Sequence, residues 1–245
     1  MAVRAERLHA RPRAKEQLDR VLAGDWPEFI FHDRVADRYL GRIRALFADL
    51  ELVLVSGGDE LVAAGWAVPL RWSGEVAELP DGYHDCLARA VREHDAGDRP
   101  DTLAILAAQV RPDQRGRGLA GELLRAFHPV AEELGCERII CPVRPTRKDR
   151  YPLTPIERYL TWTRPDGAPF DPWLRTHVRL GARLLAPAPR SQVLTGTVAD
   201  WETWTGMAFP DSGEYIIPGG LSALAIDRPA DHGVYIEPNV WLQHR

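Results

Sequence analysis

The sequence predicts an α+β domain, because three patterns along the chain combine strand-like and helix-like segments. Two apolar segments, 50–55 and 61–68, lie on either side of a polar turn with two glycines, which is typical of a β-hairpin. Residues 102–143 have the strand, helix, strand pattern of a βαβ unit, and residues 182–245 alternate short apolar runs with turns. A sheet with helices packed on it accommodates all three patterns.

A helical segment is expected before the hairpin, over residues 14–50. Its apolar residues recur at helical spacing, and Gly-Asp-Trp-Pro at positions 24–27 interrupts the run. After the hairpin, a short helix is expected over residues 83–94. The apolar positions of the first segment are Leu18, Val21 and Leu22 before the interruption and Val35, Tyr39, Ile43 and Leu46 after it.

The βαβ unit is the most regular part of the sequence. Residues 102–110 form a nearly continuous apolar run, as expected for a central strand that is covered on both faces. An amphipathic helix is expected over residues 119–134 with Gly135 as its stop, and residues 138–143 form the next strand. The apolar side of this helix comprises Leu123, Leu124, Phe127, Val130, Ala131 and Leu134.

The segment after the βαβ unit is rich in proline, so we expect only a helical turn or two near residues 156–161. A short helix follows at 173–180 and ends at Gly181. The chain shows no internal repeat and no convincing domain linker. We therefore expect one domain, in which residues 1–195 form the core and residues 196–245 form a β-rich C-terminal extension packed on it.

Composition and charge exclude several classes of protein. The chain of 245 residues has a net charge of −4, which disfavours nucleic acid as a partner. No apolar run is long enough for a membrane helix, and the basic N-terminal segment lacks the apolar core of a secretory signal. Cys86, Cys136 and Cys141 match no zinc framework, so no metal is expected. We therefore expect a cytoplasmic protein, monomeric or homodimeric, without a nucleic-acid or membrane partner.

The turn between strand 102–110 and helix 119–134 is the strongest candidate binding site. The first N–H groups of a helix have no partner within the helix and carry the positive end of its dipole. Two glycines let an anion approach the backbone closely and two arginines add positive charge, so the turn suits a diphosphate. A tight solvated turn is the alternative interpretation, and the Walker and dinucleotide-binding patterns are absent. The turn comprises Arg115, Gly116, Arg117, Gly118, Leu119 and Ala120.

The pattern Arg-x-x-Gly-x-Ala at 115–120, preceded by Val-x-Pro at 110–112, resembles the strand-to-helix signature of the GNAT (general control N-acetyltransferase-related) acyltransferase superfamily. The strand before it, the amphipathic helix after it and the next strand also follow at the spacing of that family. A second similarity is the helix at 173–180, which ends in Leu-Gly-Ala, like the last helix of the family. The resemblance covers roughly residues 14–195.

The resemblance implies the GNAT fold, a mixed and mostly antiparallel sheet flanked by helices, with one parallel strand pair that splays apart. That pair would be 102–110 and 138–143, with the pantetheine arm of acetyl-CoA or another acyl-CoA donor between the strands. Backbone groups of Gln109 and Val110 would bind the pantetheine amides, and the amides of residues 115–120 would bind the pyrophosphate.

His177 occupies a position at which many members of the family have a tyrosine that protonates the leaving thiolate, four residues before Gly181. An imidazole can carry out the same proton transfer near neutral pH, whereas a histidine that only packs within its helix is the alternative. The general base is poorly determined by the sequence. Glu157, Glu214 and Glu237 are the candidate carboxylates, and a chain of water molecules is another candidate.

The segment 144–150 is the one local basic cluster, and it follows the second parallel strand, where the family binds donor and acceptor. A solvated loop is one interpretation of this cluster. The other is a binding patch for an anionic acceptor, for the 3′-phosphate of CoA or for an acidic carrier protein. The candidate substrate-binding residues are Arg144, Trp173 and Arg190.

The leading hypothesis is an acyltransferase that moves an acetyl or other short acyl group from acyl-CoA to an amine of a small molecule, directly within a ternary complex. Asp-Pro-Trp-Leu-Arg-Thr-His at 171–177 also resembles GNAT domains that load polyketide carrier proteins, some of which decarboxylate malonyl-CoA. Arg190 is the nearest counterpart of an arginine used there, but Val143-Arg144 stands where those domains use a threonine. S-acyl transfer to a carrier-protein thiol is therefore the second hypothesis, and a non-catalytic acyl-CoA-binding module is the third.

Overall fold

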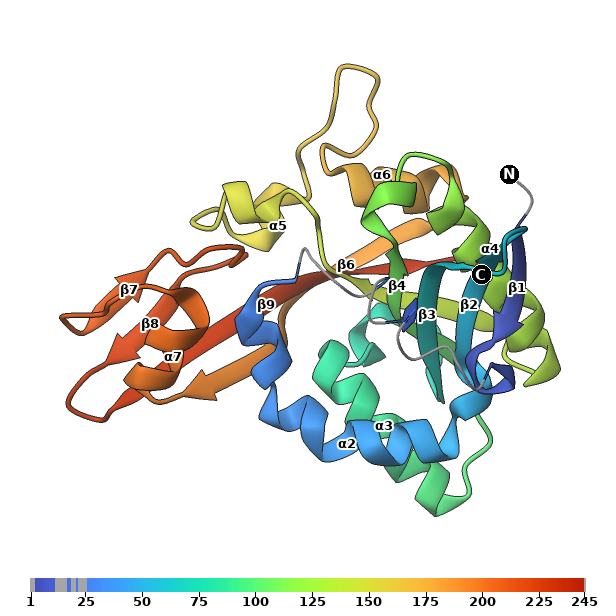
Figure 1. The fold of residues 1–245 in the computed structure, drawn as a ribbon, viewed down its shortest axis with the longest axis horizontal. Helices are drawn as coiled ribbons and strands as arrows, with labels where there is room; N and C mark the ends of the chain where they lie inside the picture. Colours follow the sequence, from blue (N-terminus) through green and yellow to red (C-terminus); the bar gives the residue numbers. More distant parts are fainter. Residues whose placement is uncertain (1–2, 12–16, 19–20, 22–25, 245) are drawn as a thin grey trace.

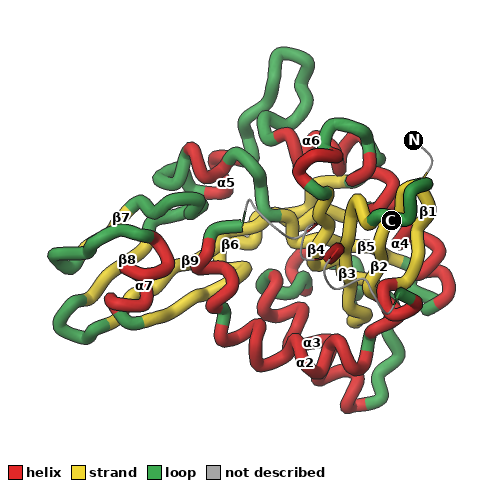
Figure 2. Tube along the Cα trace, in the orientation of Figure 1, coloured by secondary structure: helices red, strands yellow, loops and turns green. Residues whose placement is uncertain are grey.

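The computed structural model describes residues 3–11, 17–18, 21 and 26–244, whose strands form one sheet in the order β1-β2-β3-β4-β5-β9-β8-β7, with β6 paired to β9 (Figures 1 and 2). The strands are β1 (Val3–Arg7), β2 (Glu51–Ser56), β3 (Leu61–Leu70), β4 (Thr102–Val110), β5 (Arg138–Val143), β6 (Arg183–Gly196), β7 (Gly213–Tyr215), β8 (Leu224–Asp227) and β9 (His232–Gln243). The helices are α2 (Arg34–Leu46), α3 (Tyr83–Ala96), α4 (Leu119–Glu133), α5 (Ile156–Tyr159), α6 (Pro172–Arg179) and α7 (Val198–Thr205).

The N-terminal part of the sheet is antiparallel. The predicted hairpin is confirmed as β2 and β3, and β3 pairs in turn with β4. β1, which the sequence does not predict, pairs with the other edge of β2. The helix expected over residues 14–50 is only partly present: Leu18 and Val21 are helical, a 3₁₀ segment covers Glu28–His32, and α2 begins after Asp33. Leu22 and the start of the predicted interruption lie outside the described residues.

β4 and β5 are parallel neighbours over only three residue pairs, from Thr102–Arg138 to Ala104–Ile140. Beyond this point β5 continues as the antiparallel partner of β9, while β4 remains paired to β3 on its opposite side. The two strands therefore part after Ala104 and Ile140, which confirms the predicted splayed pair. We refer to this divergence of β4 and β5 as the fork.

Helices cover both faces of the sheet around the fork (Figure 1). α4 packs on one face, where Leu123 and Phe127 share a buried cluster with Cys141 of β5. α2 and α3 pack on the other face, where Leu87 shares a cluster with Ile140. Successive residues of β5 thus point to opposite faces, as in any strand. No helix in the described part of the chain is long and apolar enough to span a membrane.

The C-terminal residues return to the central sheet through β9, which pairs with β5, β6 and β8. α7 corrects the expectation of only strands and turns after residue 182: a capping box between Thr197 and Asp200 starts this helix and Gly206 ends it. The expected boundary at residue 195 lies just before the end of β6. We propose that residues 196–245 pack on the same domain as the core, because β9 supplies a strand to the core sheet.

Candidate active site

The turn at 115–120 has the backbone geometry of an anion-binding site. Gly116 and Gly118 have φ angles of 77° and 80°, in the left-handed region that favours glycine, and Gly118 is the N-cap residue of α4. The N–H groups of residues 116–120 donate a hydrogen bond to none of the described residues. Both glycines are exposed, and a Cβ at either would meet no atom within 4 Å. The peptide N–H groups at the positive end of α4 are therefore open to an anionic ligand.

A tryptophan connects the two arms of the fork. β4 changes from buried to half-buried after Ile105, where its pairing with β5 has ended. The indole N–H of Trp26 donates to the side-chain oxygen of Gln109 on β4 at 2.8 Å. The ring of Trp26 lies 5.6 Å from the guanidinium carbon of Arg144, which follows β5. Trp26 therefore lies beside the strand that we expect to bind the pantetheine arm, a position that its sequence neighbourhood does not indicate.

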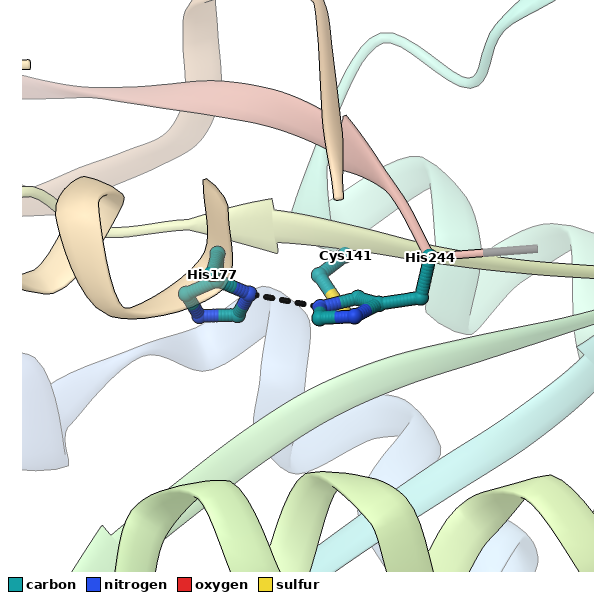
Figure 3. A group of neighbouring side chains, drawn as sticks. All are labelled: Cys141, His177 and His244. Carbon is teal, nitrogen blue, oxygen red and sulfur yellow. Dashed lines mark hydrogen bonds between the residues drawn. The ribbon is translucent and has the colours of Figure 1, made fainter. Parts of the chain in front are cut away.

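His177, on α6, is buried next to the fork, in a group with Cys141 and His244 (Figure 3). The residue is 1% exposed, and its Nδ1 lies 2.7 Å from Nε2 of His244, directly after β9. Its Nε2 is buried with no hydrogen-bond partner among the described residues. Cys141 is the first residue of β5 beyond the last pair with β4. His177 is therefore beside the point at which the two strands part.

The environment of His177 determines its charge. Burial lowers the pKa of His177 to about 3, and the neighbouring His244 contributes in the same direction. Burial also lowers the pKa of His244 to about 4, with a contribution from His128. Both rings are neutral at pH 7, because both pKa values lie far below that pH. A transfer that starts from a cationic His177 near neutral pH is thus not what this environment favours.

Trp173 and Asp171 fix the position of His177 within α6. The rings of Trp173 and His177 meet edge to face with 4.3 Å between their centroids. Asp171 is the N-cap of α6, and its Oδ1 accepts hydrogen bonds from the N–H groups of Trp173 and Leu174. Asp171 therefore caps α6, and Trp173 contacts the histidine.

Glu237, a candidate base, is a fully buried member of an ion pair. One of its carboxylate oxygens accepts a hydrogen bond from Nε of Arg144, and the other accepts one from the hydroxyl of Tyr235. Burial raises the pKa of Glu237, and the charge of Arg144 opposes this rise. Arg144 also donates to the backbone oxygen of Gly219 at 2.6 Å. Both oxygens of Glu237 thus have protein partners, as in a structural ion pair.

Replacing Arg144 with alanine is expected to destabilise the fold by about 3–5 kcal/mol, because the change leaves the buried carboxylate of Glu237 without its cation. Urea unfolding followed by tryptophan fluorescence measures this change in the free energy of unfolding. Arg147→Ala, at an exposed arginine of the same segment, is the matched control and should leave stability nearly unchanged. Equal stability of the two variants would contradict the structural role of the ion pair.

The basic segment 144–150 is not a uniform solvated loop. Arg144 and Lys148 turn inward, and the ammonium of Lys148 donates to the backbone oxygens of Tyr151 and Leu221 at 2.8 and 2.6 Å. Burial lowers the pKa of Lys148 to about 8. Only the exposed arginines of the segment, Arg147 and Arg150, are positioned as a surface patch.

Two other predicted site residues lie elsewhere. Glu214 is exposed on β7, at the opposite end of the molecule from α4 (Figure 1), so the structure does not bring it to the turn at 115–120. Arg190 is exposed on β6, at the irregularity in its pairing with β9. Both partners of His177 in Figure 3 are absent from the sequence-based site. The sequence could have indicated Cys141 and His244 only by their residue types. Their positions, in a buried strand and directly after the last strand, belong to no recognisable motif.

Comparison with known proteins agrees with this geometry. Residues 16–153 match the sequence model of the acetyltransferase (GNAT) family. The chain is 30% identical over 266 residues to the arginine N-acetyltransferase avaD of Aspergillus versicolor, and the alignment covers 96% of this chain and 91% of that protein.

Two solved structures share the fold along the whole chain. The loading GNATL domain of CurA from Lyngbya majuscula has a TM-score of 0.62 at 14% identity, over 100% of this chain and 98% of that one. The GphF GNAT-like decarboxylase, in complex with isobutyryl-CoA, has a TM-score of 0.56 at 19% identity, with the same coverage. These identities show similarity of fold alone. With the family model matching more than half of its length, this chain belongs to the GNAT acetyltransferase family and is an acyl-CoA-dependent acyltransferase of the N-acetyltransferase type.

Proposed function

We propose that this enzyme transfers an acetyl or other short acyl group from acyl-CoA to an amine of a small-molecule acceptor, by direct attack within a ternary complex. The observation that carries the proposal is the turn at 115–120, with its unpaired N–H groups and two left-handed glycines at the start of α4. A pyrophosphate held there would direct the pantetheine arm along Gln109 and Val110 into the fork. The sequence identity of 30% with an arginine N-acetyltransferase, over nearly the whole chain, supports a nitrogen acceptor.

The reaction requires one net proton movement. The acceptor nitrogen attacks the thioester carbon, a C–N bond forms, the C–S bond breaks, and the thiolate of CoA needs a proton while the nitrogen loses one. We propose that Nε2 of His177 protonates the thiolate, because this nitrogen is unpaired and lies in the group beside the fork. We propose that water takes the proton from the amine, since Glu237 is held by Arg144 and Glu214 lies on the distant β7.

Incubation of the purified protein with acetyl-CoA and a panel of amines that includes arginine tests this function. We expect release of free CoA thiol in step with an N-acetylated product detected by mass spectrometry. Malonyl-CoA with an acyl carrier protein forms the second arm of the experiment. Release of CO2 or acylation of the carrier protein, with no product on any amine, would instead support the carrier-loading hypothesis. Tight CoA binding without turnover in either arm would support the non-catalytic module.

A further inference from the structure

The hydrogen bond between His177 and His244 joins a buried ring to one that is less buried. His177 is 1% exposed, whereas His244 is of intermediate exposure. The 2.7 Å between Nδ1 of His177 and Nε2 of His244 requires a proton between the two nitrogens, donated by one ring and accepted by the other. The main chain of His244 is fixed by a hydrogen bond of 2.8 Å from its N–H to the carbonyl oxygen of Ile139 on β5.

A buried neutral imidazole cannot act as an acid by itself. If His177 gave the proton on Nε2 to a thiolate without gaining another, it would become a buried imidazolate, and a charge without a partner in this environment is costly. The transfer becomes feasible when Nδ1 gains a proton in the same step. Among the described residues, this nitrogen has a hydrogen bond only with Nε2 of His244, which can donate its proton in the tautomer that carries it there.

We propose that His244 is a relay residue for the acyl-transfer reaction, which passes a proton from solvent to His177 as His177 protonates the CoA thiolate. The proposal rests on the proposed function, because it needs a thiolate to protonate. His244 acts through His177 and touches no substrate, so it is a positioning residue and not a catalytic one. Nothing in the sequence assigns it a role.

The protons balance in this step. As the C–S bond breaks, the proton on Nε2 of His177 moves to sulfur, and the shared proton moves from Nε2 of His244 to Nδ1 of His177. Water delivers a proton to Nδ1 of His244, and the proton lost by the acceptor amine goes to water. Both rings end neutral with their tautomers exchanged. A second pair of proton shifts, with water at the two outer nitrogens, restores the starting state before the next turnover.

A metal ion bound by Cys141, His177 and His244 is the competing interpretation, because their ligand atoms lie within 4.8 Å of one another. Two nitrogens bound to one tetrahedral zinc, with Zn–N distances of about 2.0–2.1 Å, are separated by roughly 3.3 Å. The observed distance of 2.7 Å between Nδ1 of His177 and Nε2 of His244 is shorter than that and is typical of a hydrogen bond. Burial also raises the pKa of the Cys141 thiol far above its usual range, so this thiol is protonated in the absence of a metal.

The activity test is a rescue experiment on His244→Ala. We expect kcat to fall by about 100-fold, the scale of one acid–base group, with KM for acetyl-CoA little changed. Millimolar imidazole, which fits the space left by the ring, should restore part of the lost kcat in this variant and none in His177→Ala. His232→Ala, at an exposed histidine where β9 begins, is the control and should retain wild-type kcat.

The outcomes separate the two proposals. An inactive wild-type protein would overturn the proposed function together with the relay, whereas a His244→Ala variant as active as wild type would overturn the relay alone. A low kcat that imidazole fails to restore would indicate a purely structural role and also overturn the relay. Stoichiometric zinc that is lost in Cys141→Ser and retained in Cys136→Ser, measured by inductively coupled plasma mass spectrometry, would replace the relay with a metal site.

One measurement is independent of turnover. Nitrogen-15 NMR of histidine-labelled protein at pH 7 should show two neutral rings that share one N–H, and the ring signals of His177 should shift in His244→Ala. A cationic ring, or two rings that do not affect each other, would contradict the proton-sharing pair on which the relay depends.

Discussion

Gly118→Glu is expected to weaken the binding of acetyl-CoA by more than about 100-fold, a loss of about 2.7 kcal/mol or more. Gly118 has a φ of 80°, and a residue with a Cβ costs about 1–2 kcal/mol in the left-handed region, so the turn at the N-terminus of α4 should change shape. The added carboxylate also brings a negative charge to the place where the unpaired N–H groups would bind the pyrophosphate. Isothermal titration calorimetry with acetyl-CoA measures the effect.

Two further variants separate charge from backbone strain. Gly118→Ala introduces the strain without the charge and should weaken binding by about tenfold, the equivalent of roughly 1.4 kcal/mol. Gly167→Glu is the matched control, because Gly167 has a φ of 76°, is exposed and has open space around it in another turn. It should bind acetyl-CoA like the wild type. Unaltered affinity in Gly118→Glu would remove the turn from the donor site.

His177→Ala is expected to lower kcat by about 100-fold or more while the dissociation constant of CoA changes little. The reason is that His177 lies beside the fork, at Cys141, and not at the turn that would bind the phosphates. Steady-state kinetics together with calorimetry divides the effect between turnover and binding. Because removal of a buried ring also leaves a cavity, Leu174→Ala, at another buried residue of α6, controls for the loss of packing. Similar kcat values in the two variants would exclude His177 from the chemistry.

The pH dependence of kcat provides a second readout for His177. Its folded-state pKa of about 3 lies below the usual value of 6.5, so the ring stays neutral throughout assays between about pH 5 and 9. Raising the pH through 6.5 therefore removes no proton from it. We therefore expect the pH profile of kcat to have the same shape near pH 6.5 in the wild type and in His177→Ala. If kcat of the wild type changed near pH 6.5 and kcat of His177→Ala did not, a cationic imidazole would act directly.

Local patterns in the sequence predict well the elements around the turn at 115–120, the expected donor site. The unpaired amides at the start of α4, the two glycines before it and the apolar periods of β4, α4 and β5 are all set by neighbours within a few residues. The fork itself depends on pairing with β9, which no local pattern indicates, and its expectation came from the family resemblance. α7 is a different kind of omission, because Thr197, Asp200 and Gly206 form a capping pattern that the sequence displays.

The other half of the site depends on contacts between distant parts of the chain. Glu237 and Arg144 are 93 residues apart, and His177 and His244 are 67 residues apart. Neither residue of a pair shows, by itself, whether it will be buried or what it will bind. Burial then changes the chemistry further, since it makes His177 a ring that is neutral at pH 7. The residues that act as acid and base therefore cannot be assigned one at a time from the sequence, because their roles depend on the tertiary structure.

The antiparallel partnership of β5 with β9 has a consequence for the order of assembly. Ile140 of β5 pairs with Gln243 of β9. β9, which lies beside β5 beyond its last contact with β4, is therefore synthesised long after β5. Closing so long a loop is slow, and until it closes β5 presents unsatisfied peptide groups along an open edge. A nascent chain can therefore complete the turn at 115–120 early, but it can complete the fork only after β9 has left the ribosome.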